Sequence, residues 1–327
     1  MRHRRGCLLS AVFALAVWAP AHAADVSAPK VPLYPSYVYP PWQTGANNDA
    51  AARGLDFTVP EVDNLPDFHG NPIDPKLVLY VGGNYFFALA PLVKAFETQH
   101  PEYARRIFWE TLPPGELVKQ MEAGGTITVG NMTWTVKPDA YLAGLAAVQR
   151  LIEQGRLEGP AVPYVSNTLA IMVPKGNPAH VAALTDLARR NIRLAMPNAE
   201  TEGITDQIKV SLRKAGGEAL VASVYETKAK DGSTYLTRIH HRETPMFLMQ
   251  GRAEAGVTWR SETVFQEQSG NPIEHVDIPA AQNTTGLYAG GVVKDAAHKD
   301  AAAMWLAFLK SPEAVKIFES YGFKAYP

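Results

Sequence analysis

The densest group of chemically versatile side chains in the sequence is His240-His241-Arg242-Glu243. His240 and Glu243 stand three positions apart, so a helix would bring an imidazole and a carboxylate together as a pair of metal ligands. A run of this kind directly before a helix is more often a solvated or hydrogen-bonded cap. We therefore predict no metal and no cofactor.

The other patterns that carry catalysis do not occur in the sequence. It has no Gly-X-Ser-X-Gly, no His-Glu-X-X-His and no phosphate-binding loop, and Gly82-Gly83 lacks the spacing of a dinucleotide fingerprint. The only cysteine, Cys7, lies in a segment that we expect to be removed, which leaves no thiol nucleophile. A net charge of −1 gives no field that would attract nucleic acid. These observations predict a binding protein, not an enzyme, and no nucleic-acid partner.

A strand, a glycine turn and a helix provide the first position where a ligand could bind. Residues 77–81 form a continuous apolar run, typical of a strand buried on both faces. Gly82-Gly83-Asn84 breaks the run, and a helical pattern follows with Pro91 in its expected first turn. In open α/β sheets, ligands bind beyond the carboxyl ends of strands, where helix N-termini direct free N–H groups. Asn84 and Tyr85 would lie at that edge.

Strands and helices alternate along the rest of the chain. We expect a strand at 106–109 followed by a turn at 110–115, and a loop at 130–134. A helix is expected from Pro138 to Gly155, where apolar residues share one face. This alternation predicts an α/β protein with mostly parallel sheets flanked by helices.

The N-terminal region divides into a leader and an arm. Residues 1–23 have a basic start, an apolar run too short to span a membrane, and the cleavage pattern Ala21-His22-Ala23. They predict a cleaved signal peptide and a periplasmic protein. Residues 24–76 are rich in proline with interleaved tyrosines, so they form neither a helix nor a central strand. They are either an extended arm lying on the globular body or a loose leader.

Four stretches of the sequence, taken in order, resemble a known family: 77–101, 167–187, 251–257 and 301–323. They are similar to the periplasmic solute-binding proteins of ABC importers, in particular the type II molybdate-like group. The resemblance implies two α/β lobes, 77–165 plus 286–327 and 166–285, joined by a hinge of crossing strands. It also implies a ligand held between the lobes and an ABC permease in the inner membrane as partner. We expect a monomer.

The resemblance places the ligand contacts in the loops after the first strands of each lobe. Carried over by position, these residues are Asn84, Tyr85, Pro114, Gly115, Asn198, Thr201, Glu202, Trp259, Arg260 and Ser261. To them the sequence itself adds the polar and aromatic loop residues Asn131, Thr133 and Trp134.

The side chains at these positions depart from the small residues usual in oxyanion binders of the family. Glu202 would repel an anion if it faced the cleft, whereas Tyr85, Trp134 and Trp259 could form apolar walls. We therefore favour a small organic ligand. Two alternatives stay open: a molybdate- or sulfate-like oxyanion, and a role as the binding partner of a periplasmic sensor or dehydrogenase.

Cleavage after Ala23 is directly testable, because the leader has a basic start, an apolar run and a small-X-small site. N-terminal sequencing of protein from the periplasmic fraction should begin at Ala24. Membrane-bound protein that retains Met1 would show that the segment is an uncleaved anchor.

Overall fold

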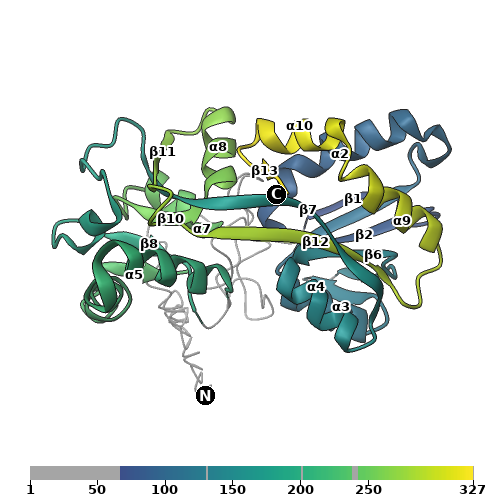
Figure 1. Cartoon of the computed structure of the whole chain (residues 1–327), viewed down its shortest axis with the longest axis horizontal. Coiled ribbons are helices and arrows are strands. Elements are labelled where there is room, and N and C mark those ends of the chain that lie inside the picture. Colours follow the sequence, from purple (N-terminus) through teal and green to yellow (C-terminus); the bar gives the residue numbers. More distant parts are fainter. Residues whose placement is uncertain (1–66, 130–131, 200–201, 238–241, 327) are drawn as a thin grey trace, which may run out of the picture. The chain divides into compact units, whose positions relative to one another are not determined.

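The computed structural model describes residues 67–326, apart from 130–131, 200–201 and 238–241 (Figure 1). The predicted signal peptide and residues 24–66 of the predicted arm lie outside these residues. None of the helices between residues 67 and 326 that the structure describes is long and apolar enough to cross a membrane.

The first lobe is built around β2 (Leu77–Gly82), every residue of which is buried. It pairs in parallel with β3 (Ile107–Leu112) and with β6 (Ala140–Gly144). β1 (Asp67–Gly70), the end of the predicted arm, pairs antiparallel with β3 at the sheet edge. The apolar run at 77–81 is therefore a central strand, as its composition predicts.

Helices cover both faces of this sheet (Figure 1). One face carries α2 (Phe86–Gln99), α9 (Lys299–Phe308) and α10 (Pro312–Ser320). The other carries α3 (Pro114–Glu122) and α4 (Leu145–Glu153). Because strand side chains alternate between faces, neighbouring residues of β2 enter two different hydrophobic clusters. Leu77, Leu79 and Val81 pack with the first set, and Val78 and Tyr80 with the second.

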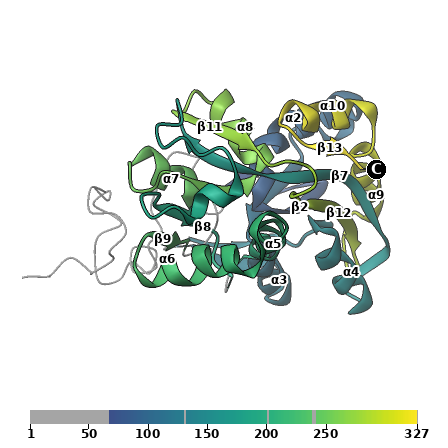
Figure 2. The ribbon, with the colours of Figure 1, turned by 60° about the vertical axis from the view of Figure 1, so that its left-hand side comes forward.

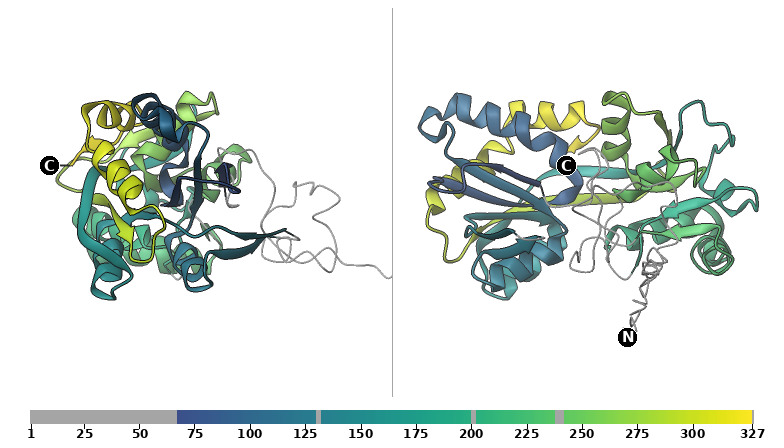
Figure 3. Two further views of the ribbon diagram at one scale, coloured as in Figure 1. Left: turned by 90° about the vertical axis from the view of Figure 1, so that its right-hand side faces the viewer. Right: turned by 180° about the vertical axis from the view of Figure 1, so that it is seen from behind.

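Two long strands continue from the first lobe into the second (Figures 1 and 3). β7 (Leu157–Pro174) and β12 (Thr285–Val293) run antiparallel, from the pair Leu157–Val293 to the pair Thr168–Thr285. Beyond Thr168, β7 pairs instead with β10 (Gly256–Trp259) and β11 (Ile273–Asp277). Within β7, Val165 accordingly packs in the core of the first lobe, and Leu169, four residues later, packs in the core of the second lobe.

The second lobe packs a separate core of aliphatic residues around β7, β8 and β10. Its other regular elements are η4 (Leu184–Ala188), β8 (Leu194–Met196), α5 (Ile204–Ala222), η5 (Ser223–Thr227), α6 (Lys228–Lys230), β9 (Thr234–Leu236), α7 (Glu243–Met249) and α8 (Arg260–Gln268). Three short elements complete the first lobe: η2 (Gly83–Tyr85), η3 (Pro101–Tyr103) and the hairpin β4 (Thr126–Val129) and β5 (Met132–Thr135). Near the C-terminus, β13 (Lys324–Ala325) pairs with β7.

Parallel pairing is confined to the interior of each lobe, at β3-β2-β6 and at β8-β9. The crossing strands, the edge strand and the hairpin pair antiparallel, so antiparallel pairs are more numerous than the sequence pattern suggests. For the crossing strands the reason is that β7 carries the chain into the second lobe and β12 brings it back, so these neighbours run in opposite directions.

Several local predictions are wrong. Residues 140–144 form strand β6, not part of a helix, because a short apolar run suits a buried strand as well as a helix face. Residues 110–112 continue β3, and 132–135 form a strand of the hairpin instead of a loop. Pro91 lies inside α2, not in its first turn, because that helix begins earlier, after a 3₁₀ turn.

The extension of β3 buries a carboxyl group, Glu110, opposite Tyr80 of β2. Its side chain is fully buried, and its oxygens accept no hydrogen bond from any residue that the structure describes. Burial raises the pKa of Glu110 from about 4.5 to about 8, and the nearby Gln120 amide opposes this only in part. The carboxyl is therefore protonated in the folded protein at neutral pH.

Glu110 makes the folding stability depend on pH. Between about pH 4.5 and 8 the folded state holds a proton that the unfolded state releases, so stability falls as pH rises through this window. Glu110→Gln should remove that slope and raise the free energy of unfolding at pH 8 by roughly 1–4 kcal/mol. Urea unfolding at pH 5 and pH 8 measures the free energy of unfolding of the wild-type protein and of the variant. Glu153→Gln, at an exposed position, is the control. An unchanged slope in Glu110→Gln would contradict this assignment.

Candidate functional site

A cavity of about 680 Å³ lies where the two lobes meet. The turn after β2, the first turns of α3, α4 and α5, Trp259 and the start of β12 all line it. Helices α3, α4 and α5 lie on the same side of the crossing strands, opposite α8 and α10 (Figures 1 and 2). The three segments that follow the carboxyl ends of β2, β3 and β6 are the turn at Gly83 and the starts of α3 and α4. They lie in one wall of the cavity, as expected for an α/β sheet.

The wall that the first lobe supplies contains helix starts whose backbone N–H groups are not capped by side chains. α4 begins after Gly144, and no side chain caps its first turn, where Leu145, Ala146 and Ala147 line the cavity. The turn Gly83-Asn84 is likewise uncapped by side chains. The small residues of α4 leave room for a ligand to approach the free N–H groups, which together carry the positive end of the helix dipole.

Asn84 and Tyr288 form the polar floor of the cavity. The Asn84 amide nitrogen donates a hydrogen bond to the Tyr288 hydroxyl, which belongs to β12. Burial, followed by the negative charge of Glu262, raises the pKa of Tyr288 well above its usual range. Tyr288 is therefore a neutral phenol throughout the physiological pH range.

The second lobe contributes an aromatic wall and carboxylates. Trp259 ends β10, is 7% exposed, and meets the Tyr288 ring edge-on with centroids 6.0 Å apart. Glu202 lies just before α5 and accepts a hydrogen bond from the Thr237 hydroxyl. Glu202 and Asp206 both line the cavity, at the N-terminal end of α5.

The structure brings five of the predicted contact residues to the cavity: Asn84, Pro114, Gly115, Glu202 and Trp259. The Tyr85 side chain itself is 1% exposed and packs inside the first lobe. Its hydroxyl lies 2.5 Å from that of Tyr164, and its ring meets Phe318 and Phe323. Tyr85 is therefore a core residue and not a wall of the cavity.

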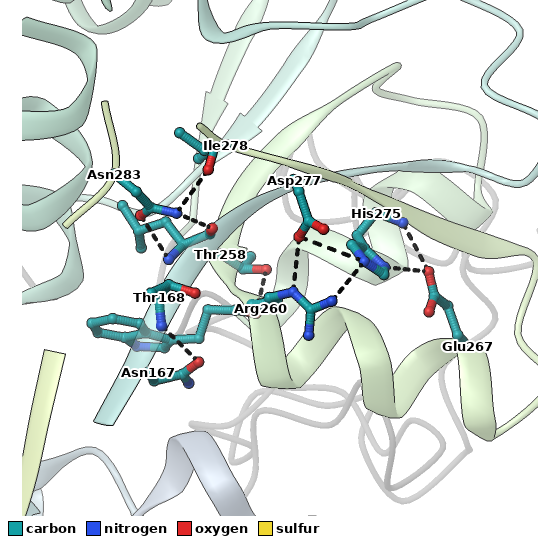
Figure 4. Close-up of polar contacts among 11 residues, drawn as sticks. Asn167, Thr168, Thr258, Arg260, Glu267, His275, Asp277, Ile278 and Asn283 are labelled. Atoms are coloured by element: carbon teal, nitrogen blue, oxygen red, sulfur yellow. Dashed lines mark hydrogen bonds and ion pairs between the residues drawn. The ribbon is translucent and has the colours of Figure 1, made fainter. Parts of the chain in front are cut away.

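Arg260 and Ser261 follow Trp259 but do not line the cavity. The Arg260 guanidinium is directed toward Asp277, 2.8 Å away, and His275, 3.2 Å away (Figure 4). Ser261 is fully buried, and its hydroxyl accepts a hydrogen bond of 2.7 Å from Asn167. Because successive residues at a helix start point in different directions, only the first of the three reaches the cavity.

Two further predicted residues, Thr133 and Asn198, are described by the structure and do not line the cavity. Thr133 lies on the exposed hairpin, with its hydroxyl 3.2 Å from that of Thr128. Asn198 is half-buried, and its backbone N–H donates to Thr237. Asn131 and Thr201 lie outside the described residues, as do His240 and the Trp134 side chain. Within the described residues, no three acidic, histidine or cysteine side chains are grouped to hold a metal.

Sequence reasoning missed the segment Gly144–Ala147, together with Arg150, Asp206 and Tyr288. The first segment was assigned to the interior of a helix, so its helix start was not recognised. The signal that would have found it is the small residue Gly144 directly after the apolar run 140–143. Asp206 and Tyr288 give no local signal, because their place in the wall depends on the partner lobe.

Gly286 of β12 sets the position of the Trp259 ring, because a Cβ atom there would lie 2.4 Å from a ring carbon. Gly286→Ala should therefore displace Trp259 and lower the free energy of unfolding by about 1–3 kcal/mol, as overpacking does. Gly115→Ala is the matched control, since Gly115 lines the same cavity and its Cβ would meet nothing within 4 Å. Equal stability of the two variants in chemical denaturation would mean that the ring is not held there.

Comparisons with known proteins show the family and the fold of this chain. The family model described as bacterial extracellular solute-binding protein matches residues 77–324. YvgL of Bacillus subtilis, named as an ABC transporter substrate-binding lipoprotein, is 26% identical over 54% of this chain. That alignment spans 63% of YvgL, a little under two thirds of its length. The sulfate-binding protein of Synechococcus elongatus is 23% identical over 78% of this chain and 74% of its own length.

A solved structure shows the fold. The periplasmic molybdate-binding protein of Azotobacter vinelandii superposes with a TM-score of 0.61 at 17% identity, covering 77% of this chain and 99% of that one. The predicted two-lobed type II binding-protein fold, with its crossing strands, is confirmed. Because the family model matches most of the chain, the protein belongs to the bacterial extracellular solute-binding proteins.

Proposed function

We propose that this protein captures a small organic molecule in the cavity between its lobes and delivers it to an ABC permease in the inner membrane. The signal peptide expected over 1–23 would place the mature protein in the periplasm, in reach of such a permease. The two curated relatives compared above are named as an ABC transporter substrate-binding lipoprotein and as a sulfate-binding protein, which supports transport and gives no support to catalysis.

The size of the cavity is the observation that carries the proposal. About 680 Å³ lies within the range of roughly 300–1,000 Å³ that is usual for sites of small organic ligands. A four-oxygen ion needs only the space of a few water molecules, each of which takes about 30 Å³ in the liquid. The Trp259 ring adds an apolar surface that a small oxyanion would not use.

An oxyanion ligand is the second candidate, and two observations favour it. The relatives compared above include proteins named for sulfate and molybdate. The uncapped N–H groups of α4 and of the turn at Gly83 also suit an anion. These features do not exclude an organic ligand, because a carboxylate or phosphate group would bind the same N–H groups.

Ligand binding would act by bridging the lobes. β7 and β12 are the main covalent and hydrogen-bonded connection between them, so rotation about these strands can open and close the cavity. A ligand that contacts Asn84 on one side and Trp259 on the other favours the closed form through contacts that the open form lacks. Closure would be the signal that the permease recognises.

Native mass spectrometry of protein purified from its own host tests the ligand class. We expect a bound organic molecule, released on unfolding, and a smaller radius of gyration in X-ray scattering when it is added back. Trp259→Ala should weaken its binding about 10–100-fold, which corresponds to roughly 1–3 kcal/mol for a buried aromatic anchor. Trp109→Ala, half-buried in β3 away from the cavity, is the control. Recovery of molybdate or sulfate as the native ligand would establish the second candidate instead.

A further inference from the structure

We propose that the cavity selects a two-ended ligand, with an anionic group held by the first lobe and a hydroxyl or ammonium group held by the second. This inference rests on the proposed function and names the chemistry of its ligand. It follows from the charges at the helix starts that line the cavity, which differ in sign between the lobes.

The first lobe presents an uncompensated positive wall. Neither η2 nor α2 nor α4 has an acidic residue in its first turn. α3 does carry Glu116, but that carboxylate binds Lys119 at 2.8 Å and does not line the cavity. Arg150 of α4 lines the cavity, is exposed, and makes no ion pair with any residue in the described ranges. Free N–H groups and a guanidinium together favour an anion here.

The second lobe presents a negative wall. α5, which begins at the cavity, carries Asp206 in its first turn. Glu202, one residue before the N-cap of α5, lines the cavity beside Asp206. Asp206 is exposed and forms no ion pair with a cation in the part of the chain that the structure describes. These carboxylates offset the positive helix ends, so an anion gains nothing from this lobe.

The acceptor for the second end of the ligand lies on α5 and not at the cavity floor. The Tyr288 hydroxyl already accepts the hydrogen bond from Asn84. A hydroxyl or ammonium group on the ligand would find an acceptor at the exposed Asp206, whereas a second anionic group would be repelled.

An inorganic oxyanion does not match these walls, because it presents negative oxygens in every direction. One side of the ion would meet the N–H groups of α4 and the other would meet carboxylates. Alternatively, Asp206 and Glu202 could serve the dipole of α5 alone, a common use of acids at helix starts. The two readings differ in whether the carboxylates discriminate between ligands, and this is measurable.

A matched series of probes isolates the second end of the ligand. Calorimetry on protein freed of co-purified ligand would compare propylphosphonate, 3-hydroxypropylphosphonate and 3-aminopropylphosphonate, with sulfate and molybdate alongside. We expect the aminopropyl probe to bind at least tenfold more tightly than the propyl probe, and the hydroxypropyl probe to lie between them. Asp206→Asn should remove most of that advantage and leave propylphosphonate binding unchanged or stronger. Arg150→Gln should weaken all three phosphonates alike.

Asp300→Asn is the control, since Asp300 is an exposed first-turn acid of α9 away from the cavity. Tighter binding of sulfate or molybdate than of every phosphonate, no preference for the donor-bearing probes, or no binding of any phosphonate would each overturn the inference. Failure of the two-ended ligand and failure of the proposed function give different results. If the protein closes on an organic molecule from its own host that carries only one functional group, the proposed function holds and the two-ended ligand is refuted.

Discussion

The antiparallel pairing of β7 with β12 is the interaction on which the rest of the structure depends. The two strands run together from Leu157 to Thr168, and β7 then continues alone into the second lobe, where it pairs with β10 and β11. A single hydrogen-bonded ribbon therefore orders both cores. It also restricts relative motion of the lobes to bending and twisting of this ribbon, which is the motion that opens a cleft.

The cavity exists because helices begin on one side of this ribbon from both lobes. α3 and α4 follow parallel strands of the first sheet, and α5 follows β8 of the second. Each start leaves N–H groups without intrahelical partners, so a polar wall arises from backbone alone. What differs between lobes is the side-chain charge added to that wall: Arg150 on one side, Asp206 and Glu202 on the other. The fold thus supplies N–H groups at the cavity from both lobes, and a few side chains set the charge around them.

Packing on the opposite side of the ribbon links α8 to the first lobe (Figures 1 and 2). The rings of Phe265 and Phe87 stack with centroids 4.6 Å apart, and Gln268 donates to the Ser320 carbonyl at 2.7 Å. Arg260 takes part in the same region through its ion pair with Asp277. Arg260, although adjacent in sequence to Trp259, is therefore engaged with β11 and does not line the cavity.

Periodicity and composition alone determined the buried central strand at 77–81, the glycine turn after it, the strand ending at Trp259 and the caps of the last helix. These features are local, because burial on both faces and helix capping leave a signature within a few residues. The two-lobed fold was predicted from the resemblance of four segments, in order, to a known family. Asn84 could be placed at the cavity because it follows a strand end, whereas Glu202 and Trp259 were placed there by that resemblance.

Only the tertiary structure decided which side chains at those strand ends face the cavity. Tyr85 and Trp259 are both aromatic residues at a helix start, yet one fills the core and the other lines the wall. The difference depends on Tyr164, Phe318 and Gly286, which are far away in sequence. The same holds for β6, whose apolar run became a strand because it lies between β2 and β12. Side-chain direction and sheet neighbours are set by contacts between distant segments, and no local pattern encodes them.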